Sequence, residues 1–439
     1  MGFKRIDVKE INGFKLGNAE NQSAGTGCTV IISEQGAVAG VDVRGGGPAT
    51  RETDLIKSEN TVQSINAVVL SGGSAFGLEA GSGVMRYLEE KGVGFKVGER
   101  SIPIVTQASL YDLEVGSGDI RPDRDMGIQA CINAYEGVFD HGNHGAGTGA
   151  SVGKFYGMDR AMKSSLGTFA CSDNVLEVGA ITAVNAFGDV YNGNNNIIAG
   201  LLSKDKDYIK GSISIMKNHV HGEGGPEAPD IRDPFKNDKV DTTIKINDSE
   251  VVDLANDNQN NVGIESDSQI LVDDSADSAE QVNVGADTDS KDIDRSEIES
   301  KLEELRAELE NNLDNHSPEL NSDNVQEEPE YEPIPVEEMG YDVPFNTTLS
   351  CLITNAKLSK TQANKLASIL HDGFARAIKP VHGTLDGDAI FVMTTNQVDV
   401  NFDAFAALAT DILQYSVIDG ALAATDAYGL KASRSIISK

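Results

Sequence analysis

The sequence contains no tryptophan, only four cysteines and seven histidines in 439 residues, and no long uninterrupted apolar run. The cysteines lie far apart without the CxxC spacing of zinc sites, so we expect reduced core thiols and no metal. No stretch approaches the 18 apolar residues or so of a membrane-spanning helix. The first residues, MGFKRIDVKEINGFKLG, have no apolar h-region, so we expect a soluble cytoplasmic protein.

Basic residues are also scarce, since 36 Lys and Arg face 69 Asp and Glu, which gives a formal net charge of −33. This balance argues against nucleic acid as a partner, because Lys and Arg neutralise phosphates, and against an anionic membrane surface. Residues 246–330 alone hold 26 acidic and four basic side chains. From 227 to 342 aromatic residues almost vanish, which predicts a disordered acidic insert. Within it, 295–313 has the spacing and charge pairs of an isolated helix.

Two blocks with globular composition flank this insert, residues 1–226 and 343–439, and we expect them to form two parts of one catalytic domain. In the first block, 27–46 predicts two short strands around the turn Glu34-Gln35-Gly36. Residues 65–95 predict a buried strand, a glycine turn and a helix that ends at Lys91-Gly92.

The second block begins with NTTLSCLITNA, which alternates as a strand. Ser359 is a suitable N-cap for the helix that follows, whose apolar side carries Leu366, Ile369, Leu370 and Phe374. The stretch 388–398 predicts a buried strand, and 402–427 predicts one or two closing helices. The two blocks together predict a mixed α and β fold.

Asn346-Thr347-Thr348 opens this second block and admits three interpretations. It is a strand start with β-branched residues, an N-x-T sequon that needs secretion to be used, or a point of self-cleavage. In the third case Thr347 Oγ attacks the carbonyl of Asn346, an N→O acyl shift gives an ester, and hydrolysis leaves Thr347 as a new N-terminus. Its own α-amine, with an ordinary pKa of about 8, can then take the hydroxyl proton.

The other candidate motifs give less specific evidence of function when each is considered alone. GAGTGASVGK (145–154) lacks the spacing of a P-loop or a dinucleotide fingerprint, and SGGSAFG (71–77) does not match G-x-S-x-G. Thr384, Asp386 and Asp388 offer a hydroxyl and two carboxylates at what can equally be a plain Asp-Gly turn. The histidines give no evident ligand set; those considered are His144, His371, His382 and HVHG at 219–222.

Read in order, however, these fragments form a series. It runs TGCTV (26–30), RGGGPATRETDL (44–55), SGGSAFGLEAGSGVMRYLEEKGVGF (71–95), GAGTGASVGK (145–154), VNAFGDV (184–190), NTTL (346–349), HDGFARAIKPVH (371–382) and DGDAIF (386–391). In this series the chain resembles the S58 family of self-processing aminopeptidases, the DmpA-like group of L-aminopeptidase/D-esterases and β-aminopeptidases. The resemblance covers about 1–225 and 343–439 and skips the acidic insert.

The resemblance implies an α-β-β-α sandwich, similar to ornithine acetyltransferase, in which helices flank two sheets. It implies cleavage into chains 1–346 and 347–439 that stay together, in an oligomer of cleaved heterodimers. The implied activity is the release of N-terminal residues from short peptides, amides or esters without a cofactor.

The resemblance also implies roles for single residues. Thr347 would be the nucleophile, and the amide of Asn185 would hold the oxyanion with help from Tyr111. Thr384 and Asp386 would orient the nucleophile and its amine, where some members carry Ser and Glu, and Asp388 is an alternative to Asp386. The glycine-rich corners would shape the substrate pocket through Gly72, Gly73, Gly147 and Thr148.

Two alternatives stay open at this point. The related fold of ornithine acetyltransferase transfers an acyl group to an amine, so the same nucleophile could serve acyl transfer. In contrast, an uncleaved and inactive relative could use the acidic insert to bind a basic partner.

Overall fold

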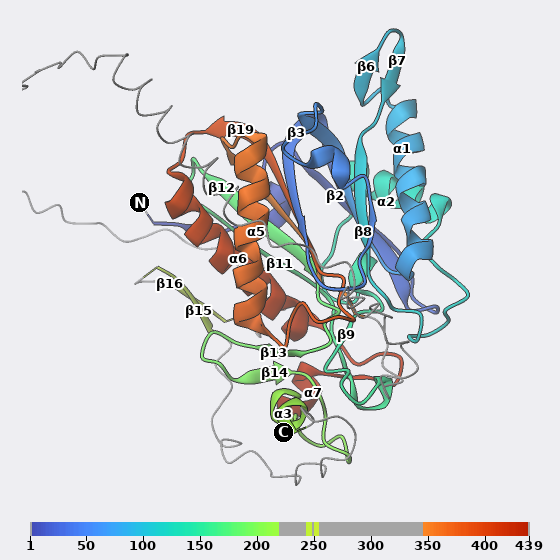
Figure 1. Cartoon of the computed structure of the whole chain (residues 1–439), viewed down its shortest axis with the longest axis vertical. Helices are drawn as coiled ribbons and strands as arrows, with labels where there is room; N and C mark the ends of the chain where they lie inside the picture. Colours follow the sequence, from blue (N-terminus) through green and yellow to red (C-terminus); the bar gives the residue numbers. More distant parts are fainter. Residues whose placement is uncertain (1, 219–242, 248–249, 254–345, 438–439) are drawn as a thin grey trace, which may run out of the picture. The chain divides into compact units, whose positions relative to one another are not determined.

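The computed structural model describes residues 2–218, 243–247, 250–253 and 346–437, which belong to one compact unit (Figure 1). Its strands are β1 (Lys4–Arg5), β2 (Lys15–Asn21), β3 (Thr26–Val43), β4 (Ala49–Arg51), β5 (Ser64–Ser71), β6 (Phe95–Val97), β7 (Arg100–Ile102), β8 (Val105–Ser109), β9 (Ser151–Val152), β10 (Met162–Lys163), β11 (Leu166–Ser172), β12 (Glu177–Ala183), β13 (Asp189–Tyr191), β14 (Ile197–Ala199), β15 (Thr243–Asn247), β16 (Glu250–Asp253), β17 (Leu349–Ala356), β18 (Ile378–Lys379), β19 (Ala389–Val398) and β20 (Lys431–Ala432). Its α-helices are α1 (Ala80–Glu90), α2 (Arg124–Glu136), α3 (Ile213–Asn218), α5 (Lys360–Ala377), α6 (Phe402–Ala423) and α7 (Ser433–Ile437).

Most of the acidic insert expected over 227–342, with the helix expected over 295–313, lies outside the described residues. So does HVHG at 219–222. The described part of the insert consists of β15 and β16, which pair antiparallel. Their sequences, TIKIN and EVVD, are rich in β-branched residues, which favour strands.

The main sheet has ten strands in the order β1-β11-β12-β17-β19-β3-β5-β8-β4, with β2 paired to β3. The strands on either side of the insert interleave in this sheet. β17 lies between β12 and β19, and β19 in turn pairs with β3. Both blocks of the sequence therefore contribute to the same sheet.

The strand β3 links the two halves of this sheet, and here the expectation of two short strands over 27–46 is wrong. One strand of 18 residues runs through the expected turn, with a register shift between Ile32 and Ala37 and Gly36 at φ +80°. Its first half pairs with β2 and β5, and its second half pairs with β19. A glycine takes this positive φ without the steric cost of a Cβ, so the strand bends instead of ending.

Because side chains alternate along each strand, the two faces of the sheet belong to different layers of the core. In β17, Leu349, Cys351 and Ile353 join a central cluster with residues of β5, whereas Leu352 joins a cluster with α5 and α6. On the far side, Val30 of β3 packs in a third cluster with α1 and α2. Figure 1 shows these two helix pairs on opposite sides of the strands. The predicted α-β-β-α sandwich is confirmed.

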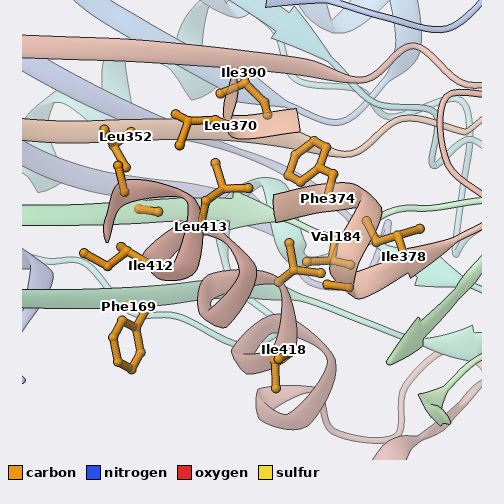
Figure 2. Packing of buried hydrophobic residues seen from close by; sticks show 14 of the residues in the cluster. Phe169, Val184, Leu352, Leu370, Phe374, Ile378, Ile390, Ile412, Leu413 and Ile418 are labelled. Carbon is orange, nitrogen blue, oxygen red and sulfur yellow. The ribbon is translucent and has the colours of Figure 1, made fainter. Parts of the chain in front are cut away.

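Helix α5 forms as its sequence predicts. The Ser359 side chain accepts a hydrogen bond from the Gln362 backbone N–H, and Gln362 reaches back to complete a capping box. Leu366, Leu370 and Phe374 are fully buried in the cluster between the sheet and α6 (Figure 2). The expected closing segment is the single helix α6, capped by Asn401.

The four cysteines are free and buried, as expected of core thiols. Among the helices that the structure describes, none has both the length and the apolar composition that crossing a bilayer requires.

We expect Phe374→Ala to lower the free energy of unfolding by about 3–5 kcal/mol, because a buried phenylalanine between sheet and helix leaves a large cavity. Asp372→Ala on the exposed side of the same helix is the matched control and should change it by less than about 0.5 kcal/mol. Chemical or thermal unfolding of both variants checks this. Equal losses would show that α5 does not anchor the core through Phe374.

Candidate active site

Thr347 stands just before β17, at the edge of the sheet where the loop leading into β19 also arrives. Asn346 N–H donates to the Leu385 carbonyl at 2.9 Å, and Gly387 N–H donates to the Asn346 carbonyl at 3.0 Å. This short parallel ladder holds Asn346 beside Asp386. Asn346 is fully buried and Thr347 is 3% exposed. The peptide bond between them is therefore fixed inside the protein.

The Thr347 hydroxyl lies against the carbonyl of its own preceding peptide bond. Its Oγ1 donates a hydrogen bond to the Asn346 carbonyl oxygen, which also accepts from Gly387 N–H. The nitrogen of the same bond, Thr347 N–H, donates to the Asn185 carbonyl at 3.0 Å. Both ends of this peptide bond are thus held by backbone groups from distant parts of the sequence.

Because Gly387 has no side chain, there is room beside it for the Thr347 hydroxyl. A Cβ at this position would lie 2.9 Å from Thr347 Oγ1 and 2.6 Å from the Gly47 carbonyl oxygen, both closer than carbon atoms normally approach. Only glycine allows the backbone N–H to reach the Asn346 carbonyl here. From the sequence, this residue was expected only as part of an Asp-Gly turn.

Asn185 is fully buried next to Thr347, and both the nitrogen and the oxygen of its side-chain amide form hydrogen bonds. Its Nδ2 donates to the Tyr111 carbonyl at 3.0 Å, and its Oδ1 accepts from Ser151 N–H at 3.1 Å and from Lys154 Nζ at 2.7 Å. Lys154 Nζ also lies 3.4 Å from the Asn185 carbonyl oxygen that holds the Thr347 nitrogen.

Lys154 was missed as a site residue, although it is the last residue of GAGTGASVGK. Burial lowers the pKa of its ammonium group to about 7. The nearby carboxylates of Asp386, Glu114 and Asp112 raise this pKa, but they offset the effect of burial only in part. A buried lysine that titrates near neutral pH can exchange protons in catalysis. The signal in the sequence was a single lysine at the end of a buried glycine-rich run.

The two carboxylates of the Asp-Gly-Asp segment have different surroundings. Burial, together with the charge of Asp388, raises the pKa of Asp386 to about 7, opposed in part by the Gly383 N–H, which lies 2.9 Å from its Oδ2. Asp388 Oδ1 accepts from Thr348 N–H at 2.6 Å, and its Oδ2 lies 2.7 Å from His382 Nδ1. Asp388 therefore contacts the strand of Thr347 directly, whereas Asp386 is the carboxyl suited to exchange a proton.

The remaining residues that the resemblance implied lie in different places. Tyr111 contacts Asn185 through its backbone carbonyl, while its hydroxyl points to Glu114 at 3.4 Å. Thr384 is exposed on the turn before Asp386. Neither the Tyr111 nor the Thr384 side chain takes part in the contacts around Thr347 described above.

The glycine-rich corners pack beside this site. Gly72 follows β5, and Gly73 N–H donates to Asp112 Oδ1 at 2.7 Å; burial raises the pKa of Asp112 to about 6. The corner at 145–148 includes Gly147 and the buried Thr148, whose hydroxyl donates to the Gly145 carbonyl at 2.8 Å. Buried Lys163 donates to the Gly147 carbonyl at 3.1 Å and so fixes the second corner.

Comparison with known proteins matches residues 6–217 and 261–434 to the peptidase family S58. The chain belongs to this family. As an S58 member the protein is a hydrolase, and the resemblance read from its motifs is confirmed.

Similar proteins include an uncharacterized aminopeptidase of Mycobacterium tuberculosis, 27% identical over 98% of this chain and 97% of the relative. The 6-aminohexanoate-oligomer endohydrolase of Paenarthrobacter ureafaciens is 24% identical over 93% of this chain and 83% of that enzyme. Among solved structures, the L-aminopeptidase D-Ala-esterase/amidase of Ochrobactrum anthropi, described as a variant of the Ntn hydrolase fold, matches with a TM-score of 0.50 at 14% identity. That match covers 95% of this chain and 86% of the other, and it supports the fold.

The buried lysines of this S58 protein predict a pH dependence of its stability. Burial lowers the pKa of Lys163 in the folded state to about 7, from an ordinary value of 10.5. Between these values the unfolded chain binds a proton that the folded chain does not, so stability rises with pH through this window. Relative to Lys163→Met, the protein should gain about 2–3 kcal/mol between pH 7 and 9. Unfolding curves at several pH values measure the difference.

Lys365→Met is a suitable control, because Lys365 lies on α5 away from this site and is not buried. Its free energy of unfolding should depend on pH in the same way as that of the unchanged protein. If the free energy of unfolding of Lys163→Met also has this same pH dependence, Lys163 stays charged when buried.

Proposed function

We propose that the protein is a threonine N-terminal-nucleophile hydrolase that first cuts its own chain between Asn346 and Thr347 and then removes N-terminal residues from short peptides, amides or esters. The observation that carries this proposal is the placement of the Thr347 hydroxyl against the Asn346 carbonyl, with that carbonyl held by Gly387 N–H. A polarised carbonyl beside a hydroxyl is the arrangement that an N→O acyl shift needs.

In the cutting step, Thr347 Oγ bonds to the Asn346 carbonyl carbon and gives its proton to a nearby base. Negative charge then develops on the Asn346 oxygen, which Gly387 N–H already contacts. The carbon–nitrogen bond breaks, the leaving nitrogen takes up a proton, and an ester joins Asn346 to Thr347. Water hydrolyses this ester, which leaves a carboxylate on Asn346 and a free hydroxyl and amine on Thr347.

The same contacts serve turnover once Asn346 has moved away. The new α-amine of Thr347 stays against the Asn185 carbonyl, close to Lys154 Nζ. A neighbouring positive charge favours the neutral amine, which is the form that accepts the hydroxyl proton. Gly387 N–H, freed from the Asn346 carbonyl, becomes available to the oxyanion of the substrate, and the second N–H of the Asn185 amide supplies a further donor.

The buried position of Thr347 fits this sequence of events. A side chain that is 3% exposed cannot meet a substrate while Asn346 covers it, so cutting must precede turnover. The two relatives carry the names of an aminopeptidase and of a 6-aminohexanoate-oligomer endohydrolase, which favours peptide and amide substrates here. The implied oligomer of cleaved heterodimers is part of this proposal.

A matched pair of substitutions tests the nucleophile. Thr347→Val removes the attacking hydroxyl but keeps the branched shape, so the chain should stay whole and inactive on aminoacyl anilides. Thr348→Val removes the hydroxyl of the next residue, which is buried without a hydrogen-bond partner among the described residues, and should still split and turn over. Gel electrophoresis, the N-terminal sequence TTLSCL of the small fragment and an anilide assay read the outcome. Splitting of Thr347→Val at residue 346 would disprove the proposal.

The pH dependence of cutting identifies the base. Asp386 and Lys154 both have a pKa of about 7 in the folded protein, and each becomes a base as the pH rises through that value. The rate of cutting in freshly folded precursor should therefore rise through about pH 7 and level off above it. Asp386→Asn and Lys154→Met tell the two groups apart, because only loss of the acting base abolishes the rise. A rate that is flat from pH 5.5 to 8.5 would exclude both.

A further inference from the structure

Two histidines that sequence analysis left without a role meet beside the candidate active site. His371 is fully buried on α5, and His382 lies on the loop that leads to β19. His371 Nε2 lies 3.2 Å from the Asp42 carbonyl oxygen, and its Nδ1 lies 3.2 Å from His382 Nε2. His382 Nδ1 in turn lies 2.7 Å from Asp388 Oδ2. A continuous chain of hydrogen bonds thus joins β3 to the carboxylate that holds Thr348.

The direction of each hydrogen bond in this chain follows from its first member. The Asp42 carbonyl can only accept, so His371 Nε2 carries a hydrogen. Burial and the nearby charge of His382 lower the pKa of His371 to about 3, so its ring is neutral and its Nδ1 is an acceptor. His382 Nε2 must then donate to it.

The other ring nitrogen of His382 faces a carboxylate. Asp388 already accepts from Thr348 N–H with Oδ1, and a carboxylate accepts at both oxygens. His382 Nδ1 therefore donates to Asp388 Oδ2. A histidine that donates from both nitrogens is an imidazolium, and here it lies 2.7 Å from a buried carboxylate that needs a counter-charge.

We propose that His382 is a positioning residue, an imidazolium oriented by His371 that neutralises Asp388 and keeps it bound to Thr348 N–H, so that Thr347 stays aligned with the bond it attacks. The inference rests on the proposed function, which it deepens. Neither histidine touches the reacting atoms.

The imidazolium also separates the roles of the two carboxylates. Asp388 is paired with a cation, while Asp386 is not paired in this way and is the carboxyl whose pKa is raised, in part by the charge of Asp388. The charged and titratable groups around the His382–Asp388 pair are Asp386 on the same loop, His371 on α5, Asp42 on β3 and Arg44 just after β3. Arg44 and Asp42 form an ion pair of 3.1 Å. The His382–Asp388 ion pair therefore leaves Asp386 as the carboxyl that exchanges a proton.

The backbone at His382 allows a sharp substitution. Its φ is +59°, in the left-handed region that asparagine tolerates better than most residues. In His382→Asn, the amide Nδ2 stands close to the place of the ring Nδ1 and can still donate to Asp388. The variant therefore keeps a neutral hydrogen bond and loses both the charge and the link to His371. His141→Asn, at a half-buried histidine outside this chain, is the control.

The first test reads the protonation of the ring directly. Nitrogen-15 NMR of histidine-labelled Thr347→Val precursor at pH 7 should show a ring with both nitrogens protonated whose signals vanish in a Thr347→Val, His382→Asn double variant. Signals of His144, which lies 2.9 Å from Glu20, should stay in both. A His382 ring with one protonated nitrogen overturns the proposal. This measurement does not depend on whether Thr347 is the nucleophile, so its failure is distinct from failure of the proposed function.

The second test is kinetic. His382→Asn should slow self-cutting by about ten- to a hundredfold, because small misplacements of a reacting group cost this much, with a melting temperature close to that of His141→Asn. The midpoint of its pH–rate profile should also move to higher pH, since the positive charge that opposes protonation of the carboxylates is gone. An unchanged rate and midpoint contradict the proposal, and so does a slow rate accompanied by an unchanged midpoint, which indicates a structural role alone.

Discussion

The hydrogen bond from Gly387 N–H to the Asn346 carbonyl is the contact on which the rest of the site depends. It joins the loop before β19, which carries Gly387, to the residues just before β17. It also fixes the carbonyl that accepts the hydrogen bond of the Thr347 hydroxyl. The approach is possible because Gly387 has no side chain to strike Thr347 Oγ1 or the Gly47 carbonyl. The sheet supplies the rigidity, since β17 and β19 continue from this point as adjacent parallel strands.

Around this contact the protein buries an unusual number of ionisable groups. Asp112, Lys154, Lys163 and Asp386 are all buried, and burial moves the pKa of each carboxyl upward and of each ammonium downward, toward neutral pH. Hydrogen bonds to backbone groups of the glycine-rich corners offset part of this cost. The corners therefore hold two of these buried ionisable groups, Asp112 and Lys163.

Local patterns in the sequence predicted the local features. Ser359 and the spacing of Leu366, Leu370 and Phe374 predicted α5 and its buried side, and the order of motifs predicted the family and the sandwich. The bend in β3 was missed because Glu34-Gln35-Gly36 has the composition of a turn, whereas pairing with β5 and β19 keeps the strand continuous. Lys154 was missed because its partner Asn185 meets it only in the folded protein. His382 was missed because Asp388, only six residues away in the sequence, gains its role from the contact with Thr348.

The position of β17 would allow the proposed cut after residue 346 to leave the fold intact. After cutting, β17 would still lie between β12 of the first fragment and β19 of its own, and β19 would still pair with β3. Helix α5 would still cover β3, while α6 packs on β11 and β12. The second fragment therefore contributes strands to the middle of the sheet, where loss of one backbone link would open the short ladder between Asn346 and Asp386 but would remove no strand and no buried cluster. The proposed cut would change the chemistry at Thr347 while the scaffold that aligns it stays in place.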